Sequence, residues 1–143
     1  MRDLRHSDGG QALVEFSLML PIILMVILGL FDVARAVWQE NTLAYAAREG
    51  TRYAIVHGST SDDPSSSTNT ADIAAAVRAA AIGVPNVTVT VSYPDTLGTL
   101  PCNERGCRVS VDATAPFVPL PSQYLLNGAL SITLRGGSLL VIQ

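Results

Sequence analysis

The chain has 143 residues, of which 48% are hydrophobic and 15% charged, and its formal net charge is −3. This length allows one modest domain, and a small, dispersed negative charge gives no reason to expect nucleic-acid binding. With only His6 and His57, and without a serine elbow, a phosphate loop or a metal-spaced cluster, the sequence predicts no catalytic site, no cofactor and no metal site.

Residues 1–10 form a short polar segment that carries Arg2 and Arg5. Arginines beside a first membrane segment tend to stay on the cytoplasmic side. We therefore expect a membrane-inserted chain with its N-terminus in the cytoplasm and residues 58–143 forming an extracytoplasmic head.

A membrane-length apolar run follows this segment. It extends from Phe16 to Phe31 without a charge, and with residues 11–15 it reaches about 21 residues, near the roughly 20 that a spanning helix needs. Pro21 lies inside the run and removes one backbone hydrogen bond, which predicts a kink in the helix.

The helix is not expected to end with the apolar run, because residues 32–56 contain no proline and are rich in helix formers. We predict one helix from about Gln11 to about Val56, on the order of 70 Å long. Two stripes follow from the spacing. One is an aromatic stripe of Trp38, Tyr45 and Tyr53. The other is a face of mostly small residues that would let another helix approach closely, and it contains Ala36, Leu43, Ala47, Gly50 and Ala54.

The segment Gly10-Gln-Ala-Leu-Val-Glu15-Phe16 resembles the prepilin signal of type IV pilins and, more narrowly, the TadE-like pilus assembly proteins of tight-adherence systems. The position of Pro21, and the cluster at residues 46–50 followed by Arg52, are also similar to that family. The resemblance implies a pilin-like structural subunit, most closely a minor pilin or pseudopilin. It implies a prepilin peptidase that removes residues 1–10, other pilin-like subunits as partners, and helices that bundle along a filament axis.

Cleavage after Gly10 would leave Gln11 as the new N-terminus and Glu15 as the fifth residue. The new α-amine of one subunit and Glu15 of a neighbour would then lie at similar depths in the membrane. Each charge is costly there alone, and pairing them offsets the desolvation and fixes the axial register between subunits. In the alternative reading, Glu15 only extends to the inner headgroups from the edge of the span.

Two other readings of the first residues stay open. Ala34-Arg35-Ala36 has the A-x-A form of a signal-peptide cleavage site, and cutting there would release a protein beginning at Val37. The long apolar region, interrupted by Glu15 and Pro21, argues against it. The chain could also be a single-pass anchor. Both readings correspond to a membrane-anchored or secreted binding domain that is not built into a filament.

The head begins with a polar loop at residues 58–69, and Thr70 or Asn69 can cap the helix that follows. We expect that helix over residues 71–82, ended by Gly83. Its predicted apolar face contains Ile73, Val77 and Ile82, with Ala80 or Ala81.

Two segments alternate between apolar and small polar residues, Val87–Tyr93 and Arg108–Ala113, and predict an antiparallel strand pair. The loop between them ends with Cys102 and Cys107. If the head is exported, a disulfide is expected, which would stabilise by about 2 kcal/mol on loop-entropy grounds. Free thiols in the cytosol, or half of a metal site, are the alternatives.

The remaining residues predict an extended crossing and two further strands. The crossing is expected at Pro116, Pro119 and Pro121, followed by one helical turn over Ser122–Leu126. Residues 130–134 alternate as a third strand, Gly136-Gly137 reads as a turn, and Leu139–Ile142 would be a fourth strand. The resulting fold class is α+β, with a long transmembrane and stalk helix (residues 11–57) packed on a small antiparallel sheet with one short helix, as in pilins.

Overall fold

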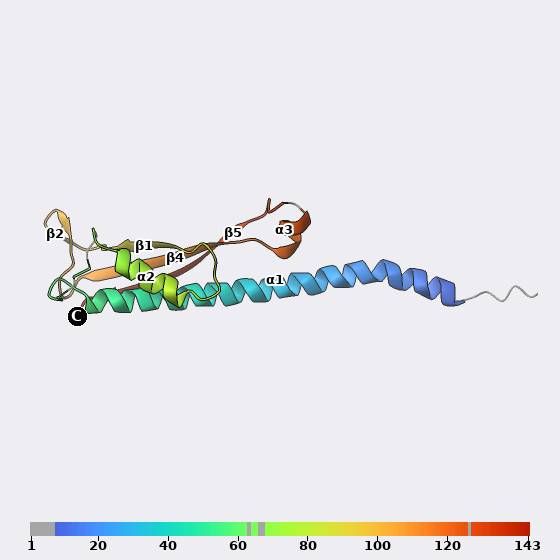
Figure 1. Cartoon of the computed structure of the whole chain (residues 1–143), viewed down its shortest axis with the longest axis horizontal. Coiled ribbons are helices and arrows are strands. Elements are labelled where there is room, and N and C mark those ends of the chain that lie inside the picture. Colours follow the sequence, from blue (N-terminus) through green and yellow to red (C-terminus); the bar gives the residue numbers. More distant parts are fainter. Residues whose placement is uncertain (1–7, 63, 66–67, 126) are drawn as a thin grey trace, which may run out of the picture.

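The computed structural model describes residues 8–62, 64–65, 68–125 and 127–143. A 49-residue helix, α1 (Asp8–Val56), carries the rest of the chain along one half of its length (Figure 1). The predicted α+β, pilin-like architecture is confirmed. The elements of the head are α2 (Ala71–Ala80), β1 (Thr88–Ser92), β2 (Thr96–Leu97), β3 (Leu100–Pro101), β4 (Arg108–Phe117), α3 (Leu120–Leu125) and β5 (Ile132–Val141).

The bounds of α1 differ from the prediction at one end. The helix ends at Val56 as expected but begins at Asp8, three residues before Gln11. A glycine costs only about 1 kcal/mol in a helix, so Gly10 does not stop one whose following residues favour it. Pro21 lies inside α1, and Figure 1 shows a bend in the blue, N-terminal part of the helix.

The head is built on a three-stranded antiparallel sheet of order β1-β4-β5. Along β4 every second residue is buried, and this alternation extends the one predicted from the sequence. The buried face of the sheet is covered by the two longer helices: α1 lies against β4 and β5, and α2 packs on both α1 and β1 (Figure 1). The buried side chains of β4 are Val109, Val111, Ala113, Ala115 and Phe117.

The predicted crossing at Pro116 is wrong, because β4 continues through this residue to Phe117. Pairing with β1 ends at Thr114, so the last residues of β4 have β5 alone as a neighbour. A proline is tolerated in such an edge position because no second ladder needs its missing N–H.

The two strands predicted near the end of the sequence are one. β5 runs without interruption through Gly136 and Gly137 and pairs with the full length of β4. The glycines do not turn the chain; they let α1 lie directly on the strand. A Cβ on Gly136 would stand 2.3 Å from the backbone nitrogen of Ala44 and 2.4 Å from the carbonyl carbon of Leu43.

The helix predicted over residues 71–82 ends two residues early, at Ala80. Gly83 has a φ of +76°, a conformation that favours glycine and turns the chain toward β1. Ile73 and Val77 are buried as predicted, and Ala81 is buried behind them. Ile82 is 75% exposed, so its assignment to the apolar face is wrong; it lies in the turn after the helix.

The small-residue face of α1 is filled by the chain's own head. Leu43, Ala47 and Ala54 have no exposed surface, and Ala36 packs against the same core. A Cβ on Gly50 would lie 2.3 Å from a methyl group of Val77, so this glycine admits a helix, but that helix is α2. The face is therefore not free for a helix of another subunit.

Replacing Gly136 with alanine should destabilise the head strongly, because the new methyl group meets helix backbone that cannot move aside. Overpacking of this kind costs about 1–3 kcal/mol, occasionally more. We expect an unfolding midpoint well below that of the unmodified chain, measured by urea denaturation in detergent micelles.

Gly137→Ala is the matched control. Its methyl group would lie on the opposite face, 2.8 Å from Oδ1 of Asp112, a side chain that can rotate. Asp112 pairs with Arg135 at 2.8 Å on the surface of the sheet, and the new methyl group would disturb only this ion pair. The control should therefore lose much less stability, since a surface ion pair contributes about 0–1 kcal/mol. Equal losses in the two variants would contradict the close helix–strand approach.

Candidate functional site

In the N-terminal half of α1, residues 10–31 are exposed throughout. Within the part of the chain that the structure describes, α1 is the one helix long and apolar enough to cross a membrane, and none of its apolar window is buried. A signal sequence near the N-terminus would meet the same criterion. The exposure of so many large apolar side chains requires lipid or protein to cover them.

The residues singled out for processing and assembly lie on the first turns of this exposed half. Gly10 and Gln11 are both helical, so the proposed cleavage would cut within the first turn of α1. Glu15 follows Gln11 by four residues and shares its side of the helix. Its carboxylate has no ion pair with any residue that the structure describes. Phe16 is 61% exposed.

Ser17 and Pro21 lie one turn apart in the same exposed segment and affect its hydrogen bonds. The Ser17 hydroxyl donates to the carbonyl of Val14 at 2.8 Å, which satisfies a polar side chain inside the apolar run. Pro21 itself lacks the N–H that would reach the Ser17 carbonyl, so the helix has a local weak point there.

A second group of residues joins the helix to the head where the apolar run ends, a role that the sequence did not predict for them. Asp32 is 7% exposed, and its Oδ2 accepts the backbone N–H of Leu120 at 2.9 Å. Arg35 donates to the carbonyl of Val118 at 2.6 Å and lies over the Phe117 ring, 4.7 Å from its centroid. The two charges are 3.8 Å apart. The sequence signal that could have indicated this contact is the pair of opposite charges, Asp32 and Arg35, three residues apart directly after the uncharged run.

These contacts position α3, which begins at Leu120 rather than at the predicted Ser122. Ser122 does not cap the helix. Its hydroxyl accepts the N–H of Leu130 at 3.0 Å and donates to the Leu130 carbonyl at 3.2 Å, closing the loop after α3. Leu126, the predicted end of this turn, lies outside the described residues.

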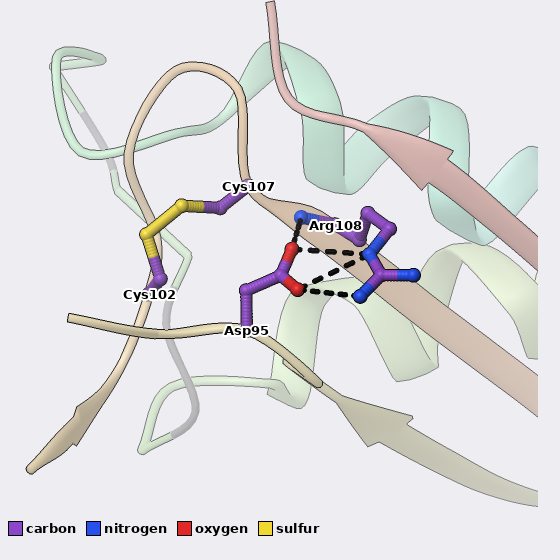
Figure 2. The surroundings of a disulfide bond; sticks show 4 residues. All are labelled: Asp95, Cys102, Cys107 and Arg108. Carbon is purple, nitrogen blue, oxygen red and sulfur yellow. Dashed lines mark hydrogen bonds and ion pairs between the residues drawn. A yellow bond between two sulfur atoms is a disulfide. The ribbon is translucent and has the colours of Figure 1, made fainter.

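The opposite end of the head contains the disulfide between Cys102 and Cys107, whose Cα atoms are 5.9 Å apart (Figure 2). The N–H of Cys102 bonds to the Asp95 carbonyl at 2.8 Å. Ile142, which is buried, is held to the same loop by two backbone bonds, donating to Cys107 at 2.8 Å and accepting from Gly106 at 2.9 Å. The loop therefore anchors the chain after β5.

The polar loop after α1 is fastened to the same region. The N–H of Ser59 donates to the Asn103 carbonyl at 3.1 Å, and the Asn103 side-chain amide donates to the carbonyl of Ser65. His57 follows α1 directly and its ring stacks on Tyr53 with centroids 3.9 Å apart. His6 lies outside the described residues. Over the residues that are described, no three His, Cys, Asp or Glu side chains are grouped to hold a metal ion.

Asp95 and Arg108 form a bidentate ion pair beside the disulfide, with Oδ1 and Nη2 2.7 Å apart (Figure 2). The side-chain hydrogen bonds from Arg108, together with its backbone N–H at 2.7 Å, hold the pKa of Asp95 below its ordinary value. The same pair raises the pKa of Arg108. Farther inside, burial raises the pKa of the Tyr93 hydroxyl, and the neighbouring Ser65 acts in the opposite direction.

A long apolar helix that carries a small α+β head along its second half defines a pilin-like protein. The family model described as "TadE-like protein" matches residues 10–52, so the match begins at the proposed cleavage position and ends within α1. This match confirms the resemblance to TadE-like proteins. The family implies involvement in the tight-adherence pilus system, in which TadE-like proteins are structural. Searches of curated proteins and of solved structures found no match.

Arg108→Gln should raise the pKa of Asp95 toward the ordinary range of a carboxyl group, because only the backbone N–H then remains to stabilise the charge. A lowered pKa adds stability that is present above the unfolded-state pKa and is lost as the pH falls through the lowered value. The variant should therefore lack most of this contribution at neutral pH, and its stability should depend less on pH as the pH falls. Carbon-detected NMR titration of the carboxyl groups measures the shift.

Arg105→Gln is the control. Arg105 is exposed on the same loop, and its substitution removes an equal charge. Its Asp95 titration should match the unmodified chain. An Asp95 pKa that stays low in the Arg108 variant would contradict the assigned cause.

Proposed function

We propose that this protein is a minor pilin or pseudopilin of a tight-adherence type IV pilus, trimmed after Gly10 and assembled through the N-terminal half of α1. The observation that carries the proposal is the exposure of the whole apolar segment from residue 10 to residue 31 on a helix that is fixed to its head. The TadE-like match over residues 10–52 supports it independently.

Glu15 is the register element in this proposal. Trimming creates an α-amine on Gln11, and the carboxylate of a neighbouring copy can neutralise it at similar depth. Within one copy the helix carries Gln11 and Glu15 four residues apart, about 6 Å along the axis, so a small axial stagger brings one copy's amine beside the other's carboxylate. Pairing fixes that stagger, because other staggers leave both charges unpaired in an apolar layer.

The orientation follows from charge and redox chemistry. Arg2 and Arg5, outside the described residues, favour a cytoplasmic N-terminus. A disulfide persists in an oxidising compartment, and the bond between Cys102 and Cys107 supports an extracytoplasmic head. The protein then resides in the inner membrane and reaches the cell exterior in an assembled pilus.

Cleavage at Ala34-Arg35-Ala36 fits the structure poorly. It would cut α1 inside its contact with the head, since Arg35 binds the Val118 carbonyl and Ala36 packs against the core. A released protein would keep the remaining helix but lose the Asp32 contact that holds α3.

Mass spectrometry of the mature N-terminus tests processing. Co-expression with a prepilin peptidase should give a chain that begins at Gln11, and Gly10→Val should block the cut because a side chain then occupies the cleavage position. Gly9→Val is the matched control and should still be trimmed after Gly10.

Mature protein that begins at Met1 would contradict the proposal and favour the membrane-anchored binding domain, and protein that begins at Val37 would favour the secreted form. The same spectrum reports whether the Gln11 amine is free, since cyclisation of an N-terminal glutamine would remove the cation that Glu15 needs.

Glu15→Ala should remain in the membrane and be trimmed normally but fail to enter assemblies, because the partner's amine is left unpaired. Sedimentation of sheared surface filaments, followed by immunoblotting, measures incorporation. Glu40→Ala, which removes an exposed carboxylate farther along α1, should be incorporated like the unmodified chain. Normal incorporation of the Glu15 variant would contradict the register role.

A further inference from the structure

Residues 117–125 and 127–132, here termed the α3 hairpin, are fixed to α1 at one height. Asp32 binds the N–H of Leu120, and Arg35 binds the Val118 carbonyl and covers Phe117. The Ser122 hydroxyl ties Leu130, which lies two residues before β5, to the same position. Figure 1 shows α3 as the part of the head that lies nearest the N-terminal half of the helix.

That height coincides with the end of the apolar run. Phe31 is its last residue and Asp32 the first charge after it. A hydrocarbon layer about 30 Å thick takes about 20 helical residues, so a span that begins near Gln11 ends near Phe31. The α3 hairpin therefore lies at the outer boundary of the hydrocarbon layer, given the membrane placement proposed above.

The hairpin has the composition of a membrane interface. No charged residue occurs between Asp112 and Arg135, although charges occur at both ends of that interval. Three of its large side chains point to solvent: Tyr124 is 79% exposed, Leu130 60% and Ile132 52%. An apolar body with one polar tip is typical of tyrosines at the headgroup level.

We propose that the α3 hairpin rests on the outer surface of the phospholipid bilayer, with Tyr124 and Leu130 entering the headgroup and upper acyl region. The surface is continuous with the membrane-spanning half of α1, and the lack of charge removes the desolvation cost that would keep it away. The contact rests on the proposed membrane placement of α1.

The contact sets the depth of the helix in the membrane. Because Asp32 and Arg35 bind the hairpin to α1, the head stops the helix from sinking farther. Glu15 lies 17 residues before Asp32, about 25 Å along the axis. Its depth, and that of the Gln11 amine, is then fixed in each copy before assembly.

Tryptophan quenching by brominated lipids tests the proposal. Trp38 is the chain's one tryptophan, so Trp38→Phe gives a background into which single probes are placed. Tyr124→Trp reports on the hairpin. Tyr45→Trp is the matched control, a 57% exposed tyrosine on α1 farther from the apolar run, and Met25→Trp verifies insertion. Each full-length variant is reconstituted in phosphatidylcholine vesicles brominated either near the headgroups or near the bilayer centre.

The Tyr124 variant should lose most of its emission with bromine near the headgroups and much less with bromine at the bilayer centre. The Met25 variant should show the opposite preference, and the Tyr45 variant should not be quenched by either lipid. Leu130→Ser, added to the Tyr124 variant, should weaken the quenching because one apolar contact is removed.

An unquenched Tyr124 variant beside a quenched Met25 variant would overturn the hairpin contact and leave the proposed function intact. Blue-shifted emission without bromine dependence would place the hairpin against protein, such as a second copy of this chain, and would also overturn it. An unquenched Met25 variant would overturn the membrane placement, and the inference with it.

Discussion

The close approach of α1 to β5 is the constraint on which the rest of the structure depends. At Gly136 the strand lies directly against the backbone of Leu43 and Ala44, with no side chain between them. The helix is thereby seated against the sheet, and Gly50 lets the Val77 side chain of α2 pack closely on α1. Helix and head are joined as one body, so the position of the head determines the position of the exposed half of the helix.

The two ends of the head have different chemistry. At the end nearest the apolar run, Asp32 and Arg35 hold an uncharged hairpin to the helix. The far end is stabilised by the disulfide and by the ion pair between Asp95 and Arg108. Ile142 is buried against the same loop. This polarity fits the proposed placement of the protein on a membrane, in which the apolar half of α1 would contact lipid before assembly and other subunits afterwards.

Sequence patterns predicted the elements whose signals are local and periodic. The long helix follows from the apolar run and the helix formers after it, and residues 108–113 of β4 follow from strict alternation of apolar residues. The TadE-like resemblance was carried by residues 10–16, within the region that the family model matches. The processing and assembly roles of these residues stay predictions, because a single chain does not contain the partner on which they depend.

Sequence patterns did not predict the features that depend on tertiary neighbours. A Gly-Gly pair is equally suited to a turn and to close backbone approach, and only the helix beneath Gly136 distinguishes the two. Pro116 fits in β4 because β1 has already ended. The small-residue face of α1 correctly predicted a close helix, but its spacing does not say whether that helix belongs to the same chain.

The central claim, that Glu15 of one copy meets the trimmed N-terminus of another, is tested most directly by zero-length carbodiimide cross-linking. The chain contains no lysine, so the α-amine of Gln11 is the one primary amine that trimming at Gly10 would leave to react with a carboxylate. In isolated assemblies, we expect a cross-linked dimer in which mass spectrometry finds an amide between Gln11 and Glu15. A dimer joined through another carboxylate, or no dimer from assembled protein with a free amine, would contradict it.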